Sequence, residues 1–343
     1  MGGGLIQLVA YGAQDVYLTG NPQITFFKVV YRRHTNFARE CIEQVFDGTA
    51  SMGNSVVCTL SRSGDLVNNV YLSSKVVIGG GSTNRVGHGL IKMCEVEIGG
   101  QRIDKHYSQW LQIYSELKGD LGQPIAADNN NPAVGGTDPT HYANVGFAQM
   151  VGDDVHTTGT ARVTVPLRFW FCNNPGLALP LIALQYHEVK IKITFSQTTD
   201  HTNVSSISDT KLLVDYIYLD TDERRRFAQV SHEYLIEQVQ HEGKVTATVA
   251  GSSANITVNY NHPVKYIAWA VQDATAAAGL HFKSLANLGE LIGTAGEEGS
   301  GKLMLNGNDR FEARTMDYFT RVQPYQHFGV SIPDNRIGVY SFA

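Results

Sequence analysis

Apolar and polar residues alternate most regularly over residues 187–195, HEVKIKITF. One side of an extended chain would carry four apolar residues, Val189, Ile191, Ile193 and Phe195. Successive side chains of a β-strand point to opposite faces of its sheet. The pattern therefore predicts a strand in a sheet with one buried face and one solvated face.

Similar short runs, rich in Val, Ile, Thr and aromatic residues, recur between clusters of Gly, Asn, Asp and Pro. This arrangement is typical of an all-β sandwich. The further strands that we expect lie at 55–60, 68–78, 91–98, 161–167, 211–219, 244–249, 255–260, 264–272, 302–307 and 336–342.

Two helices interrupt the β pattern. Residues 102–119 carry apolar side chains at three- and four-residue spacing, which predicts a helix that ends at Gly119. The stripe consists of Ile103, Tyr107, Trp110, Leu111, Tyr114 and Leu117. In residues 220–229, Asp220 stands three residues before Glu223, as in a capping box. This second helix is a candidate boundary between two β domains.

Three segments read as loops. Residues 120–160 and 273–300 are rich in Gly, Ala, Asn, Asp and Thr, and we expect long surface loops there. Residues 79–89, GGGSTNRVGHG, follow a predicted strand and open no predicted helix. We expect a hairpin loop there rather than a dinucleotide site.

Composition describes a globular chain with few charges. Of its 343 residues, 43% are hydrophobic and 17% are charged, which argues against general disorder. The formal charge of −5 gives no overall reason to bind nucleic acid, and we expect no direct nucleic-acid binding. The four cysteines are widely spaced, which favours a reducing compartment.

The sequence carries no complete catalytic or metal-binding motif of the kinds considered below. Residues 296–303, GEEGSGKL, have the spacing of a phosphate-binding loop, but Leu303 replaces the required Ser or Thr and a strand follows. Neither His187-Glu188 nor His232-Glu233 has the second histidine that a zinc hydrolase helix requires. We therefore expect no catalytic residue, cofactor or metal site, and favour a structural or binding role over an enzyme.

Several motifs together resemble one family. They are NPQITFFKVVYRRHTNFA (21–38), LDTDERRRFAQVSHEYLIEQ (219–238), NHPVK (261–265), LNGNDRF (305–311), YFTRVQPYQHF (318–328) and IGVYSF (337–342). With residues 166–191, they resemble the major capsid protein of nucleocytoplasmic large DNA viruses in order and over nearly the whole chain.

The resemblance implies a double jelly roll, in which two β-sandwiches are joined by a short helical linker. The implied division is an extended segment at 1–23, a first jelly roll at 24–219, a linker at 220–238 and a second jelly roll at 239–343. Because IGVYSFA reads as a strand just begun, and family members continue with further strands, we expect the second sandwich to be incomplete.

The implied function is structural. Trimers of nearly hexagonal outline would tile the facets of an icosahedral shell in the virion, after assembly in the host cytoplasm. Expected partners are two further copies of the chain, neighbouring capsomers, minor capsid proteins, the inner viral membrane and host glycans. The alternatives are a minor capsid or scaffold paralogue, and a jelly-roll glycan-binding protein.

The resemblance also suggests candidate assembly and core residues. The segment PLRFWFCNNPGLALPLIAL would fill the first sandwich and the contact between sandwiches, with a turn at residues 173–176; the alternative is that it fills one core only. Arg32, Arg33 and Arg39 would meet neighbouring subunits or the membrane. The candidates are Phe26, Phe27, Tyr31, Arg32, Arg33, Trp170, Phe171, Pro175, Leu179 and Pro180.

Overall fold

The computed structural model describes residues 36–79, 85–120, 145–152, 159–198, 204–243, 245, 255–270, 299–329 and 337–342. By its contacts, Phe37–Ala343 is one compact unit. The expected extended segment at 1–23 lies outside the described residues, as do most of the predicted strand at 244–249 and most of the two predicted loops.

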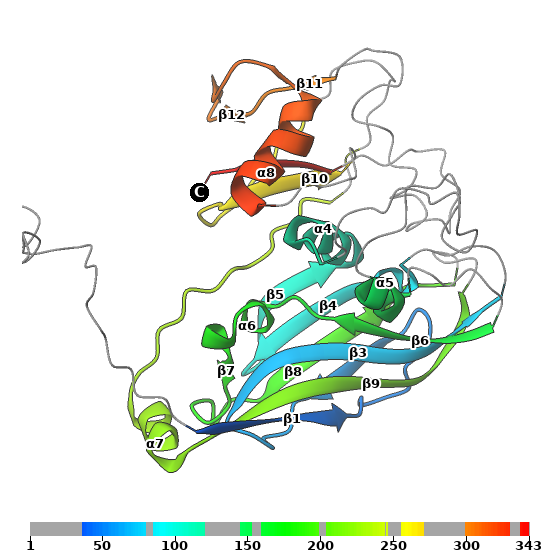
Figure 1. Cartoon of the computed structure of the whole chain (residues 1–343), viewed down its shortest axis with the longest axis vertical. Helices are drawn as coiled ribbons and strands as arrows, with labels where there is room; N and C mark the ends of the chain where they lie inside the picture. Colours follow the sequence, from blue (N-terminus) through cyan, green and yellow to red (C-terminus); the bar gives the residue numbers. More distant parts are fainter. Residues whose placement is uncertain are drawn as a thin grey trace, which may run out of the picture. The chain divides into compact units, whose positions relative to one another are not determined.

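The first sheet is built of antiparallel strands from distant parts of the chain (Figure 1). Its order is β1 (Phe37–Gln44), β9 (Val204–Leu219), β3 (Leu66–Ile78) and β6 (Gly159–Pro166). The two-residue strand β7 (Leu179–Pro180) pairs with the start of β3. The register between β3 and β9 shifts at three places, so the long central pair is bulged and not uniform.

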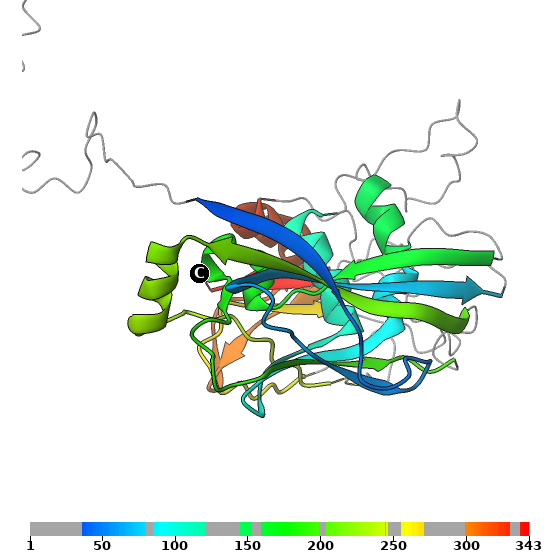
Figure 2. The ribbon, with the colours of Figure 1, turned by 90° about the horizontal axis from the view of Figure 1, so that it is seen from below.

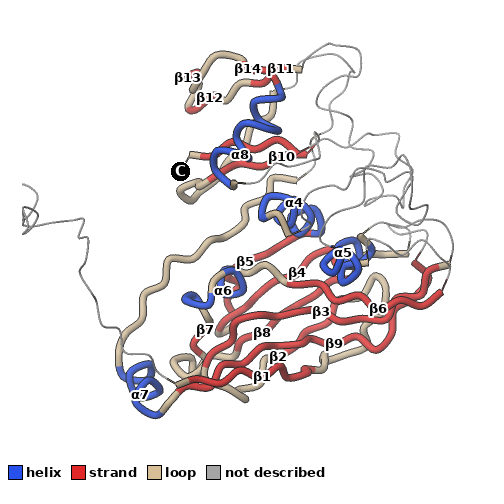
Figure 3. Tube along the Cα trace, viewed as in Figure 1, coloured by secondary structure: helices blue, strands red, loops and turns tan. Residues whose placement is uncertain are grey.

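The second sheet has the order β2 (Ser55–Thr59), β8 (Val189–Phe195), β4 (Ile91–Ile98) and β5 (Gln101–Tyr107). The two sheets lie face to face (Figure 2). Apart from β4 and β5, which are neighbours in one sheet, each main strand is followed by one in the opposite sheet. Eight main strands arranged in this way form a jelly roll, with few short helices added (Figure 3).

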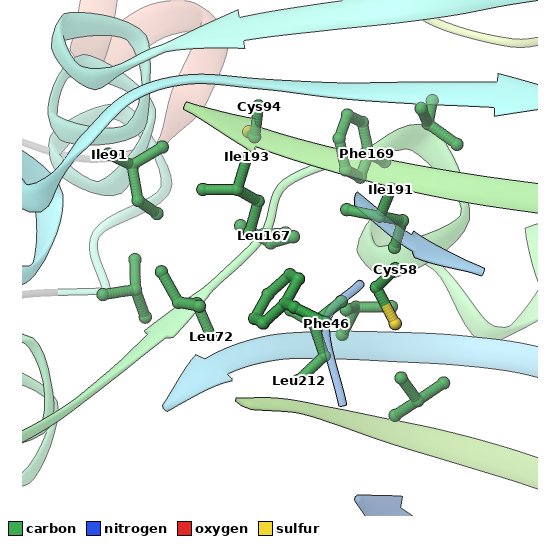
Figure 4. Packing of buried hydrophobic residues seen from close by; sticks show 14 of the residues in the cluster. Phe46, Cys58, Leu72, Ile91, Cys94, Leu167, Phe169, Ile191, Ile193 and Leu212 are labelled. Carbon is green, nitrogen blue, oxygen red and sulfur yellow. The ribbon is translucent and has the colours of Figure 1, made fainter. Parts of the chain in front are cut away.

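The core lies between the sheets, where side chains from both converge (Figure 4). Strand β8 alternates as its sequence predicts, because its four apolar residues are buried and the three residues between them are only partly covered. Leu72 and Leu212 of the first sheet enter the same cluster as Ile191 and Ile193 of the second. The strand predicted at 91–98 is confirmed with the same bounds, and those at 55–60, 68–78, 161–167 and 211–219 are confirmed with one or both ends shifted.

Short helices decorate the sandwich: α3 (Val86–Leu90), α4 (Ser108–Lys118), α5 (Val145–Val151), α6 (Trp170–Asn173), the 3-10 turn η1 (Pro175–Leu177) and α7 (Thr221–Gln229). Helix α4 ends as predicted at Gly119, whose φ of 71° is the left-handed conformation that glycine adopts without strain. The Asp220 side chain accepts a hydrogen bond from the Thr221 amide and begins the predicted helix α7.

Three expectations about local structure were wrong. Residues 102–107 belong to strand β5 and not to a helix. The segment 79–89 is not a hairpin loop, because it contains the start of α3 and joins β3 to β4 in the other sheet. The predicted loop at 120–160 contains helix α5. Residues 102–107 pair with β4, and α3 and α5 pack on β6, which are tertiary contacts that a local sequence pattern does not record.

The C-terminal part contains smaller sheets. Strand β10 (Tyr266–Ala270) pairs with β15 (Ile337–Ser341), β11 (Ser300–Gly301) with β14 (Arg314–Thr315), and β12 (Met304–Leu305) with β13 (Asn308–Asp309). Between β14 and β15 lie a π-helical turn, η2 (Tyr318–Val322), and helix α8 (Gln323–Phe328). The predicted strands at 264–272, 302–307 and 336–342 are therefore present in shortened form.

The strand predicted at 255–260 is not present. These residues are described, yet they carry no strand, and Ile256 is 59% exposed. Alternation predicts which side chains would share a face, but a strand also needs a neighbour for its backbone hydrogen bonds. Among the strands that the structure describes, none pairs with this segment.

Candidate functional site

The segment after β6 turns into the core of the first sandwich. Phe169 and Phe171 are fully buried, and Trp170 is 5% exposed. The Phe169 ring stacks on that of His106 with centroids 4.8 Å apart, while Trp170 and Phe171 meet edge to face at 5.2 Å. Much of the apolar surface of residues 166–191 is thus buried inside the sandwich that its own strands build.

A local turn separates this aromatic group from β7. The Asn174 side-chain oxygen accepts a hydrogen bond from the Gly176 amide at 2.8 Å, and the exposed Pro175 opens η1. Leu179 and Pro180 are buried where β7 pairs with β3. The predicted turn at residues 173–176 is therefore built by a side-chain bond and a proline.

The candidate residues fall into two groups. Trp170, Phe171, Leu179 and Pro180 are buried, and Pro175 is exposed on the turn. Five others lie outside the described residues: Phe26, Phe27, Tyr31, Arg32 and Arg33. A role for either group in contacts between subunits remains a prediction.

Helix α4 packs both on the first sandwich and on the C-terminal part. Leu111 is fully buried in the main core, whereas Ile113 and Leu117 belong to a separate cluster with Ile337 and Val339 of β15. Partly buried residues of β10 and α8 pack against this second cluster. The helix therefore contributes to two hydrophobic clusters, one on each side.

Aromatic side chains extend this contact. The Trp110 ring stacks on that of Tyr266 at 6.2 Å with an interplanar angle of 20°, and Tyr266 meets Phe328 edge to face at 5.1 Å. Burial raises the pKa of Tyr266, and it raises the pKa of Tyr114 to about 12. The raised pKa values show that the charged phenolates would be disfavoured in this packed contact.

A buried polar network holds α4 against α3. Arg85 Nη1 lies 3.0 Å from Glu116 Oε1, and both side chains are almost completely buried. Gln112 Nε2 donates to the same carboxylate oxygen at 2.9 Å, so Gln112 Oε1 is left to accept from His88 Nδ1 at 2.8 Å. The carboxylate thus orients the amide, and the amide selects the histidine tautomer.

The histidine in this network is uncharged. The pKa of His88 is lowered to about 3, mainly by burial and also by the positive charge of Arg85, while the hydrogen bond that the ring donates to Gln112 acts in the opposite direction. A second proton would place a second cation beside Arg85 in a buried site. The geometry of the network suits a histidine that helps to position α4 against α3, and not one that transfers protons.

The connecting segment after α7, residues 230–243, lies along strand β5 at the edge of the second sheet. Gln238 Nε2 donates to the Ile103 carbonyl oxygen at 2.6 Å, and the Val239 amide donates to Asp104 Oδ1 at 3.1 Å. The other Asp104 oxygen lies 2.8 Å from His106 Nε2. Covering an edge strand in this way blocks unwanted strand pairing.

Sequence reasoning found only part of the α4 contact. The predicted stripe included Trp110 and Leu117 but not Ile113, because a single stripe was assumed. A usable signal was present, since apolar residues occupy more of the circumference of α4 than one narrow stripe requires. Its partners on β15 follow only from tertiary structure.

The described surface of the C-terminal part carries apolar contact area. Exposed apolar side chains in the C-terminal part include Met304 at 49%, Leu305 at 44% and Tyr325 at 72%. Within the described ranges, no three His, Cys, Asp or Glu side chains are grouped to hold a metal ion. In the same ranges, no helix is long and apolar enough to cross a membrane.

Comparison with known families accounts for nearly the whole chain. Residues 25–220 match a family model described as the major capsid protein N-terminus. Residues 223–343 match a model described as the large eukaryotic DNA virus major capsid protein. The two matches meet at helix α7.

Individual relatives agree with these models. The major capsid protein of Pyramimonas orientalis virus is 52% identical over 332 residues, covering 95% of this chain and 76% of that protein. The major capsid protein of Paramecium bursaria Chlorella virus 1 is 43% identical over 376 residues, covering 100% and 82%.

Solved structures show the same fold. A chain of the PBCV-1 virus capsid, in a quasi-atomic model, matches with a TM-score of 0.73 at 37% identity, over 93% of this chain and 81% of that one. The Faustovirus major capsid protein matches with a TM-score of 0.59 at 12% identity, over 97% and 86%, and supports the fold alone.

Proposed function

The chain belongs to the major capsid protein family of large eukaryotic DNA viruses, and we propose that three copies of it form one capsomer of nearly hexagonal outline. Members of this family are structural, non-enzymatic components of icosahedral virions. The protein accordingly belongs to the virion capsid and assembles into the shell with other capsid subunits.

The trimer is proposed because of the double jelly-roll fold. One chain supplies two sandwiches, so three chains around a threefold axis supply six similar units, which can occupy a hexagonal outline. The first sandwich has all eight main strands, and the C-terminal part carries exposed apolar side chains at Met304, Leu305 and Tyr325. Such side chains suit an interface that forms on assembly.

We propose the domain division on the same basis. The first jelly roll would span 24–219, the linker 220–238 and the second jelly roll 239–343, after an extended segment at 1–23. The break between the two family models, at 220 and 223, supports a boundary at α7. The described linker is only partly helical, because α7 ends at Gln229 and the remaining residues carry no regular structure.

The trimer is tested by the solution mass of the full chain, measured by light scattering coupled to size exclusion at several concentrations. We expect a discrete species near three times 37.6 kDa. A monomer at every concentration, with native circular dichroism, would contradict the proposed trimer while leaving the family membership intact.

We further propose that Arg32, Arg33 and Arg39 contact neighbouring capsomers, minor capsid proteins or the inner viral membrane during cytoplasmic assembly. Arg39 is exposed on strand β1, at the edge of the first sheet. The test reverses two charges, Arg32→Glu with Arg33→Glu, and compares particle assembly with an Arg225→Glu, Arg226→Glu control on exposed helix α7. Equal assembly by both variants would remove the proposal.

A further inference from the structure

We propose that α4 is a shared core element, on which the order of β10 and β15 depends, while the connecting segment 230–243 acts only as a tether. This inference goes beyond the proposed trimer, because it concerns the inside of one chain. It assigns to one helix the task of fixing the C-terminal part on the first sandwich.

Helix α4 supplies half of the buried residues of the second cluster. The cluster has four buried residues, and two of them, Ile113 and Leu117, come from α4. The other two, Ile337 and Val339, come from β15. Without α4, the cluster would lose two of its four buried residues, and Ile337 and Val339 would keep only each other as buried partners in it.

The opposite face of the β10 and β15 pair is covered locally. Trp269 of β10 meets Phe319 of η2 at 5.4 Å, and Tyr340 of β15 meets Phe311 at 5.1 Å. The Trp269 ring also lies against Gly338, where an added Cβ would overlap it. One face of the pair therefore depends on its own part of the chain and the other on α4.

A two-stranded sheet needs such cover on its apolar faces. Strands β10 and β15 pair only with each other among the described strands. A lone two-stranded pair is marginally stable in water and gains stability by packing on a helix. The packing on α4 supplies what the pair lacks.

Helix α4 is itself fixed to the first sandwich, so it can serve as a rigid platform. Its residue Leu111 is fully buried in the main core. The buried network of Arg85, Glu116 and Gln112 holds another side of α4 against α3. A platform of this kind transmits orientation, because its side chains cannot shift independently of the sandwich.

The connecting segment has no buried residue, although half-buried Ile236 packs on the main core and the His241 ring meets that of Tyr107 at 4.5 Å. Its bonds to β5 come from Gln238 and Val239, and the Glu237 to Lys265 ion pair is more than half exposed on both sides. Exposed ion pairs contribute little to stability. The segment therefore keeps the C-terminal part near the sandwich without fixing its angle.

The test is hydrogen exchange of the full chain, followed by mass spectrometry of peptides from β10 and β15 and from β3 and β8. Ile113→Lys places a charge in the shared cluster. Gln109→Lys puts the same charge on α4 outside that cluster, and Gln238→Ala weakens the tether. Native size-exclusion profiles are recorded for each variant, so that a change in oligomeric state is read separately from exchange.

We expect Ile113→Lys to speed exchange in β10 and β15 about tenfold or more, with β3 and β8 unchanged, and both other variants to match the parent. The proposal would be overturned if exchange in β10 and β15 were unchanged in Ile113→Lys. It would also be overturned if Gln238→Ala were the one variant in which these strands exchange faster. Should Ile113→Lys also unprotect β3 and β8, the milder Ile113→Ala takes its place, with the same two outcomes.

Discussion

The Tyr216 hydroxyl donates to the Ser61 carbonyl oxygen at 2.7 Å. Tyr216 belongs to β9 of the first sheet, and Ser61 lies where the chain crosses from β2 in the second sheet to β3 in the first. The ring is fully buried, so this bond satisfies the only polar atom of a large core side chain. It also fixes the crossing of the chain between the sheets.

The same ring makes Gly64 sensitive to substitution. A Cβ at Gly64 would lie 2.7 Å from the Tyr216 Cβ, which is closer than two non-bonded carbon atoms approach. We expect Gly64→Ala to lower the free energy of unfolding by about 1–3 kcal/mol, measured by urea denaturation.

The matched control for Gly64→Ala is Gly79→Ala, where an added Cβ meets nothing within 4 Å. Tyr216→Phe, which removes only the hydroxyl, should cost about 1 kcal/mol. Equal stability of the two alanine variants would show that the strand and loop around Gly64 shift without cost.

The sequence predicted the strands of the first sandwich well where apolar residues face inward, and failed at β5, where polar residues do. Ile103 and Tyr107 suggested a helix because they are four residues apart. In the structure the buried positions are Asp104 and His106, whose Oδ2 and Nε2 atoms lie 2.8 Å apart. A pattern based on hydrophobicity cannot recognise a strand whose buried side is a polar pair.

The candidate site was predicted in part for a related reason. Burial of Trp170 and Phe171 follows from their own hydrophobicity, which sequence records directly. The pairing of Ile113 with Val339 joins residues more than two hundred positions apart. Nothing local in either segment identifies the other, so this contact needed the structure.

Trp170 should dominate the stability of the segment after β6. It is 5% exposed and packs edge to face on Phe171 in the main core. We expect Trp170→Ala to cost about 3–5 kcal/mol, because the neighbouring side chains only partly collapse into the space. Tyr186→Ala, at a residue that is 93% exposed, is the control and should leave the denaturation midpoint unchanged. A small effect at Trp170 would mean that the core around it repacks.

The thiol of Cys41 should be alkylated slowly for an exposed cysteine. Its pKa is raised to about 11, first by burial of part of the side chain and then by the hydrogen bond and the charge of Asp215. Asp215→Asn removes that charge, so the pKa of the thiol should fall and alkylation at pH 8 should quicken. A fall of one in the pKa of the thiol should raise the alkylation rate about threefold, because the larger thiolate fraction is partly offset by the weaker nucleophilicity of each thiolate.

The readout for Cys41 is the alkylation rate of its peptide, followed by mass spectrometry. Glu40→Gln changes a carboxylate on the same strand that does not raise the pKa of Cys41, and serves as the control. Equal rates in the two variants would contradict the role assigned to Asp215.

His88 should make stability depend on pH. Its pKa is about 3 in the folded protein against 6.5 for the free side chain, because the ring is buried beside Arg85. The unfolded chain therefore binds one more proton than the folded chain between these values, so stability rises with pH in that window and is lost as pH falls below about 6.5. For this one group, the loss between about pH 7.5 and about pH 5 should be about 2 kcal/mol.

The contribution of His88 is isolated by comparison with His88→Gln, which keeps a polar side chain beside Gln112 but cannot titrate. The difference in unfolding free energy between parent and variant, from urea denaturation at several pH values, should shrink by about 2 kcal/mol over that range. Carboxylates shared by both proteins cancel in the difference. A constant difference would mean that protonated His88 is tolerated in the folded chain, by movement of α3 away from α4 or by entry of water.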